Sequence, residues 1–150
     1  MYIPLCAIAA LGEVKPRRHA DWPQRLALYL QGREKSPFAW GANDCCTFAA
    51  DAVIAMTGKD AMRALRGRYT SERGAARLIK QAGGLEPLVS RYLGEPLARI
   101  AMAGRGDVVL MPNPERGPCL AICVGTDAAA AGVEGTILFP MSVALAAWKV

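Results

Sequence analysis

The sequence predicts an α+β fold, in which a helical N-terminal part packs on a short antiparallel sheet formed by the C-terminal third. In the first two thirds, apolar residues recur at three- and four-residue spacing, which is typical of amphipathic helices. After Gly94 the pattern changes to short apolar runs separated by segments rich in Gly and Pro, which is typical of strands and turns. At 150 residues, the chain is long enough for a single domain with its own core.

The first helix is expected over residues 22–32, because Asp21 is a good N-cap, Pro23 suits the first turn and Leu26 would face the core. The second is expected over 44–57, ending at Gly58. Its apolar face would consist of Phe48, Ala49, Ala52, Val53 and Met56. Three shorter helices are expected over 60–66, over 71–83 and through 88–93.

Four strands are expected in the last third of the chain. They would cover residues 99–102, 107–111, 119–125 and 136–139. The alanine run at 128–130 is expected to be a loop, and Asp107 a turn or strand-start residue rather than an acid. We expect residues 19–150 to form the single domain.

Residues 1–18 are expected to be an N-terminal arm or strand, with a mis-assigned start codon as the alternative. Their apolar run lacks a basic leading region and contains Pro4, so it is a poor signal peptide, and it is too short to span a bilayer. The net charge of +5 comes from scattered basic residues, so we expect no nucleic-acid partner. The five cysteines show no CxxC spacing, which favours a reducing compartment over disulfides or a zinc ribbon.

The segment FAWGANDCCTF, residues 38–48, places Cys45 in the first turn of the second helix. A helix N-terminus stabilises a thiolate through its free N–H groups and its dipole, and Asp44 would cap that turn. Cys45 is therefore a candidate nucleophile. The alternative is that Cys45 and Cys46 are buried structural thiols. Trp40 is expected to pack against the helix, with a position lining a cleft as the alternative.

Three motifs occur in an order that resembles the NlpC/P60 group of papain-like cysteine peptidases. They are DCCTF at 44–48, GDVV at 106–109 and CLAICVG at 119–125. The family patterns are DCSGF, GDLV and HVGIYxG. The resemblance implies a papain-like fold, with Cys45 as nucleophile and the helix start stabilising an oxyanion. It also implies that the general base should stand at position 119.

Position 119 is a cysteine, and a thiol is a poor base for another thiol. The one histidine, His19, is expected to be an ordinary surface residue before the first helix, with a catalytic role as the alternative. A missing base would remove about 10²- to 10⁴-fold of rate. The sequence therefore predicts that the catalytic pair is broken.

The chain also resembles a narrower set of small phage and prophage proteins. The shared features are the Trp22-Pro23 helix start, the FAWGxxDCC motif, a GRY segment at 67–69 and Trp148 near the end. This resemblance implies a tail-tip, baseplate or tail-assembly component, made in the host bacterial cytoplasm and placed in the virion tail. Its partners would be other tail proteins, with peptidoglycan as a further candidate. The alternative is an active cysteine hydrolase, a peptidoglycan peptidase or amidase carried by the tail.

Two other groups of residues have open interpretations. The four thiols of Cys45, Cys46, Cys119 and Cys123 could bind zinc or an iron–sulfur cluster, with small core residues as the alternative, and we expect no cofactor. Cys119 and Cys123 would share a strand face by alternation, and the resemblance to the NlpC/P60 group implies that Cys45 lies across from it. The candidate interface residues are Arg66, Arg68, Tyr69 and Trp148; the alternatives are a solvated loop for the first three and a tail anchor for Trp148.

Overall fold

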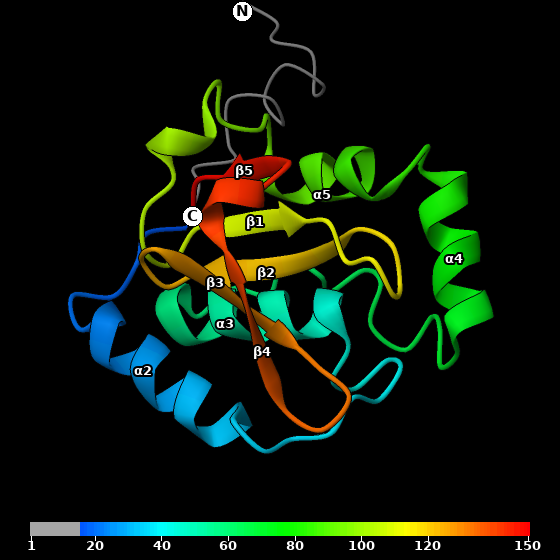
Figure 1. Ribbon diagram of the computed structural model, residues 1–150, viewed down its shortest axis with the longest axis horizontal. Helices are drawn as coiled ribbons and strands as arrows, with labels where there is room; N and C mark the ends of the chain where they lie inside the picture. The colour runs from blue at the N-terminus through cyan, green and yellow to red at the C-terminus, as the bar shows by residue number, and fades with distance from the viewer. Residues whose placement is uncertain (1–15) are drawn as a thin grey trace, which may run out of the picture.

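The computed structural model describes residues 16–150, in which four helices precede a five-stranded sheet (Figure 1). The helices are α2 (Trp22–Arg33), α3 (Cys45–Thr57), α4 (Glu72–Gln81) and α5 (Leu85–Leu93). The strands are β1 (Val108–Met111), β2 (Cys119–Cys123), β3 (Asp127–Ala131), β4 (Thr136–Pro140) and β5 (Ala146–Trp148). Short 3-10 helices cover Ile100–Met102 and Met141–Val143. The α+β class is confirmed.

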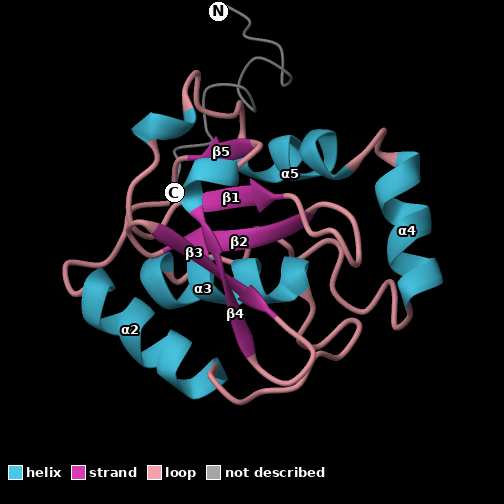
Figure 2. Ribbon diagram, in the orientation of Figure 1, coloured by secondary structure: helices cyan, strands magenta, loops and turns pink. Residues whose placement is uncertain are grey.

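The sheet is antiparallel throughout, in the order β4-β3-β2-β1-β5. Helix α3 packs on one face of it and α2 packs on α3, while α4 lies on the other side of the molecule from α2 (Figures 1 and 2). The strand face toward α3 carries Val108, Leu110, Leu120, Ile122 and Trp148. The opposite face carries Val109, Met111, Cys119, Ala121 and Cys123. None of the helices among residues 16–150 is long and apolar enough to cross a membrane.

Helix α3 is the central helix, and its ends follow from local chemistry. The Asp44 carboxylate accepts the Thr47 N–H at 2.9 Å, and the Thr47 hydroxyl oxygen accepts the Asp44 N–H at 2.8 Å. This capping box satisfies two backbone donors. Gly58 ends the helix with a φ of 74°, a left-handed conformation that glycine adopts without strain. The predicted core face is buried, including Phe48, Val53 and Met56.

Two predicted elements in the first 102 residues are wrong. Residues 60–66 form turns rather than a helix, because Asp60 accepts the Met62 N–H and Gly67 turns the chain with a φ of 79°. Residues 99–102 do not form the expected strand: Ile100–Met102 is a 3-10 helix, and Met102 is exposed. The Asp21 carboxylate, predicted to cap α2, accepts from Arg25 instead, at 2.7 Å.

Two strands were not predicted. Residues 128–130 belong to β3, where the alanines are almost completely buried between β2 and β4. Strand β5, Ala146–Trp148, pairs with β1 at one edge of the sheet. Both strands are rich in alanine, a residue with little β-propensity, so their pairing comes from tertiary packing. The expected N-terminal arm falls mostly on residues 1–15, outside the described part of the chain.

Candidate functional site

The start of α3 is held by contacts from two loops. Gly41, with a φ of 80°, donates its N–H to the second Asp44 carboxylate oxygen at 2.8 Å. The Tyr69 hydroxyl donates to the same oxygen at 2.6 Å. A side chain at position 41 would lie 2.7 Å from the Tyr69 carbonyl oxygen, so glycine is required there for the two loops to meet. Asp44, 1% exposed, therefore fixes the first turn that carries both cysteines.

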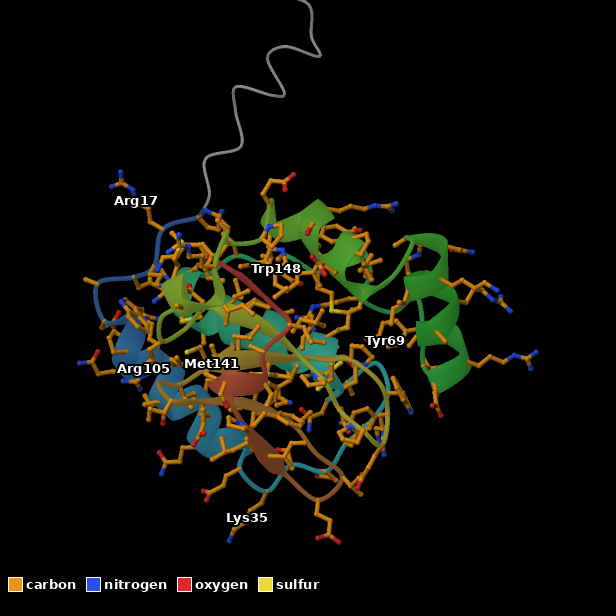
Figure 3. The ribbon with its side chains drawn as sticks, turned by 45° about the horizontal axis from the view of Figure 1, so that its top comes forward. Arg17, Lys35, Tyr69, Arg105, Met141 and Trp148 are labelled. Atoms are coloured by element: carbon orange, nitrogen blue, oxygen red, sulfur yellow. The ribbon has the colours of Figure 1, made fainter. Side chains whose placement is uncertain are left out.

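Tyr69 points inward, to the helix start, and not to solvent. It is buried, and Figure 3 shows it between α4 and the body of the protein, whereas Arg17 and Lys35 extend outward. Burial, followed by its hydrogen bond to Asp44, raises the pKa of Tyr69. The predicted interface residue is thus a buried support of the Asp44 cap.

The two thiols at the helix start influence each other. The Sγ atoms of Cys45 and Cys46 lie 4.0 Å apart. The largest influence on the pKa of Cys45 is the hydrogen bond that the Cys46 thiol donates to it, which lowers this pKa. Burial raises the pKa of Cys45, and a hydrogen bond from the backbone of Leu120 lowers it further. The same contact, together with burial, raises the pKa of Cys46. Cys45 is therefore the more acidic thiol of the pair.

Cys119 begins β2 and lines the same pocket as Cys45. Burial, followed by the nearby Cys45 charge, raises the pKa of Cys119 to about 12, although a hydrogen bond from the Asn113 side chain acts the other way. A thiol that stays protonated at neutral pH cannot accept a proton from Cys45. Asn113, in the PNP turn before β2, was not predicted as a site residue, and its position in a turn gave no signal for it.

His19 lies at the wrong end of α3. The backbone N–H of His19 donates to the Met56 carbonyl oxygen at 2.8 Å, and a side chain on Gly58 would meet the His19 ring at 3.3 Å. A helix of 13 residues is about 20 Å long, so this imidazole is remote from Cys45 at the other terminus. His19 is exposed, as expected for a surface residue before the first helix, and its position at the far end of α3 does not place it beside Cys45.

The four thiols proposed as metal ligands are divided between the start of α3 and strand β2. Cys119 and Cys123 share the sheet face away from α3, as alternation predicted, whereas Cys45 packs against the apolar clusters on both faces of the sheet. Cys123 donates to the Gly125 carbonyl oxygen at 3.5 Å. Among residues 16–150 there is no group of three or more His, Cys, Asp or Glu that could hold a metal ion.

The remaining predicted interface residues differ in exposure. Arg66 bridges two carboxylates, Asp51 at 2.6 Å and Asp60 at 2.7 Å. Trp148 of β5 is labelled in Figure 3. It is completely buried and donates its ring N–H to the Ser90 hydroxyl oxygen at 3.1 Å. It is therefore an internal anchor of the C-terminal strand. Arg68 is exposed.

A pocket of about 220 Å³ opens beside the two cysteines. Its lining is mostly apolar, and the side chains that α3, α4 and α5 contribute include Ala49, Val53, Leu78, Ile79, Leu88 and Val89. Phe38 and Trp40 also line it and pack edge to face, with ring centroids 4.9 Å apart. Trp40 therefore both packs and lines the pocket. The arrangement places Cys45, the thiol with the lowered pKa, in the wall of an apolar cavity.

Asp107 has a structural role. Its fully buried carboxylate accepts from Arg18 at 2.8 Å, from the Gly104 N–H at 2.8 Å and from the Val150 N–H at 3.0 Å. It joins the segment before α2 to β1 and to the residues after β5. The expectation that Asp107 is not an acid of the site agrees with this geometry.

Comparison with known proteins gives a fold and a family. The chain is similar in structure to the NlpC/p60 domain of the peptidoglycan hydrolase SagA, with a TM-score of 0.55 and 17% sequence identity. The match covers 85% of this chain and 97% of that domain, and at this identity it shows the fold alone. No curated protein matches the chain. Residues 17–150 match the family described as a domain of unknown function, DUF6950, and the chain therefore belongs to that family.

Proposed function

We propose that the chain is a tail-tip, baseplate or tail-assembly component of a phage, with an NlpC/P60-like fold that has lost amide hydrolysis. The observation that carries the loss of hydrolysis is Cys119, a protonated thiol that stands beside Cys45 where the NlpC/P60 pattern has its histidine. The tail role is supported by the resemblance of the FAWGxxDCC, GRY and Trp148 features to phage proteins.

Amide hydrolysis needs more than a nucleophile. The leaving amine must receive a proton and the attacking water must lose one, and both transfers use a positioned acid or base. Among the described residues, neither Cys119, which lies beside Cys45, nor His19, which lies at the far end of α3, meets this need. The fold does not need the catalytic cysteine–histidine pair for stability, because its stability comes from the core. It can therefore serve as a binding module.

Hydrolysis is tested by incubating the purified chain and its Cys45→Ala variant with peptidoglycan and its stem peptides. We expect no release of amine that depends on Cys45. Release by the wild type that the variant lacks would contradict the proposal.

The tail role is tested separately. Virions produced by a host in which the chain carries a tag are purified and analysed by mass spectrometry. We expect the tagged chain in purified particles, or in tail-assembly intermediates from the same lysate. Its absence from both fractions would contradict a tail role.

The second candidate is a cysteine hydrolase carried by the tail. The lowered pKa of Cys45 favours it, since a structural thiol has no need of this property. This candidate requires a base from outside residues 16–150. It predicts the Cys45-dependent release of amine that the first proposal excludes.

A further inference from the structure

The pocket beside Cys45 differs from a site for a polar peptide. Most of its lining is apolar and includes alkyl side chains of three helices, among them Val53 of α3, Leu78 of α4 and Leu88 of α5. An apolar cavity of about 150 Å³ holds benzene, so about 220 Å³ has room for a medium-length hydrocarbon chain. The partly buried Cys45 lies in the wall of this pocket.

We propose that Cys45 accepts an acyl group from an acyl thioester and that the acyl chain occupies the pocket. The Cys45 thiolate attacks the carbonyl carbon, and the new Sγ–carbon bond replaces the bond to the donor sulfur. The donor thiol leaves as a thiolate and takes a proton from water. No electrons are gained or lost.

The missing base explains why the substrate is a thioester. An amine must be protonated before it leaves, whereas a thiolate, whose conjugate acid has a pKa of about 8.5, leaves by itself. The first-turn N–H groups of α3 have no helical carbonyl to bind, and the Asp44 cap accepts the Thr47 N–H. The N–H of Cys45 can therefore stabilise the developing oxyanion.

The lack of a general base beside Cys45 also keeps the acyl group in place. Hydrolysis of the adduct requires a base that activates water, and Cys119 holds its own proton at neutral pH. The long life of the adduct thus rests on the proposed loss of hydrolysis, but its formation does not. The expected product is one S-acylated chain, without turnover.

The test uses octanoyl-coenzyme A and acetyl-coenzyme A with the full chain at neutral pH. Intact-mass and peptide mass spectrometry follow the adduct, hydroxylamine removes it, and free coenzyme A is measured in parallel. Octanoyl N-acetylcysteamine distinguishes recognition of the acyl chain from recognition of the nucleotide. Burial of each methylene is worth about fourfold in binding, so we expect octanoyl to label at least tenfold faster than acetyl.

Three variants test the pocket and the thiol. Cys45→Ala should abolish labelling. Leu78→Trp narrows the pocket from α4 and should slow octanoyl labelling at least tenfold, and much more than it slows acetyl labelling. Arg77→Trp is the matched control, because this exposed residue on the same helix does not line the pocket. Circular dichroism confirms that each variant is folded.

The outcomes separate the two proposals. A persistent octanoyl adduct at Cys45, blocked by Leu78→Trp, supports both. No adduct and no release of coenzyme A overturns the acylation, as does equal labelling by acetyl and octanoyl. Continuous release of coenzyme A and octanoate that depends on Cys45 supports acylation but overturns the long life of the adduct, whereas the loss of amide hydrolysis is decided by the peptidoglycan assay.

Discussion

At the scale of single residues, the reactivity of Cys45 depends on Cys46. The neighbouring thiol lies 4.0 Å from the Cys45 sulfur and favours its thiolate by donating a hydrogen bond. Two adjacent cysteines thus have different acidities, although burial affects both. The difference decides which of them can act as a nucleophile.

Replacing Cys46 with alanine removes this donor, so we expect Cys46→Ala to raise the pKa of Cys45. The measurement is the rate of iodoacetamide alkylation at Cys45 against pH, read by peptide mass spectrometry. In the wild type the midpoint should lie below the free-thiol value of about 8.5, and the variant should move it upward. Cys123→Ala, on the sheet face away from α3, should leave it in place. An unchanged midpoint in Cys46→Ala would contradict the assignment.

Cys119 should make the stability of the fold depend on pH. Its pKa is about 12 in the folded state, against an ordinary value of 9.0, so between these values the folded state keeps a proton that the unfolded state has lost. The free energy of unfolding then falls as pH rises, by at most about 1.4 kcal/mol per pH unit. We expect Cys119→Ala to lose less stability than the wild type between pH 9 and pH 11 in urea titrations. Parallel curves would show that Cys119 titrates normally.

At the scale of elements, the N-terminus of α3 carries more stability than that of α4. The Asp44 carboxylate caps α3 and also accepts from Tyr69 and Gly41 in the interior, whereas the Ser71 hydroxyl accepts the Gly74 N–H at an exposed helix start. The α3 cap thus joins two loops to the central helix. The α4 cap is a local contact.

We expect Asp44→Ala to lower the free energy of unfolding by about 3 kcal/mol, because it removes the cap and leaves the buried Tyr69 hydroxyl without its acceptor. Ser71→Ala is the matched control and should cost about 1 kcal/mol. Urea denaturation of both variants measures the difference. Equal losses would mean that the Tyr69 and Gly41 contacts contribute nothing.

At the scale of the whole molecule, Asp107 links distant parts of the chain. Arg18 lies before α2, and its guanidinium contacts the Asp107 carboxylate at 2.8 Å and the Val150 carbonyl at 2.9 Å. It also stacks over the Trp22 ring, 4.2 Å from the centroid. Arg18 thereby connects the start of the helical part to the end of the sheet.

We expect Arg18→Ala to lower the free energy of unfolding by about 3 kcal/mol, because Asp107 is fully buried and loses its principal cation. Arg25→Ala removes an exposed pair with Asp21 and should cost under about 1 kcal/mol. Thermal and urea denaturation compare the two variants. A cost as small for Arg18→Ala as for Arg25→Ala would show that Asp107 does not depend on this link.

Much of the helical part and the identity of the candidate nucleophile could be predicted. Residues 44–57 were predicted because apolar spacing, the Asp44 cap and Gly58 are all within one segment. Residues 60–66 and 128–130 were mispredicted, because Asp60 and Gly67 favour turns locally and the alanines become a strand only between two neighbours. The sheet order likewise depends on pairings that no short segment encodes.

The sequence by itself determined the fold class, the capped helix with Cys45 in its first turn, and the absence of histidine after that cysteine. These are properties of composition and of contacts a few residues apart. Only the tertiary structure decided that Tyr69 supports Asp44, that His19 lies at the far end of α3, and that an apolar pocket opens beside Cys45. The physical reason is that these features arise from contacts between residues far apart in the chain, whose energies depend on the packed core.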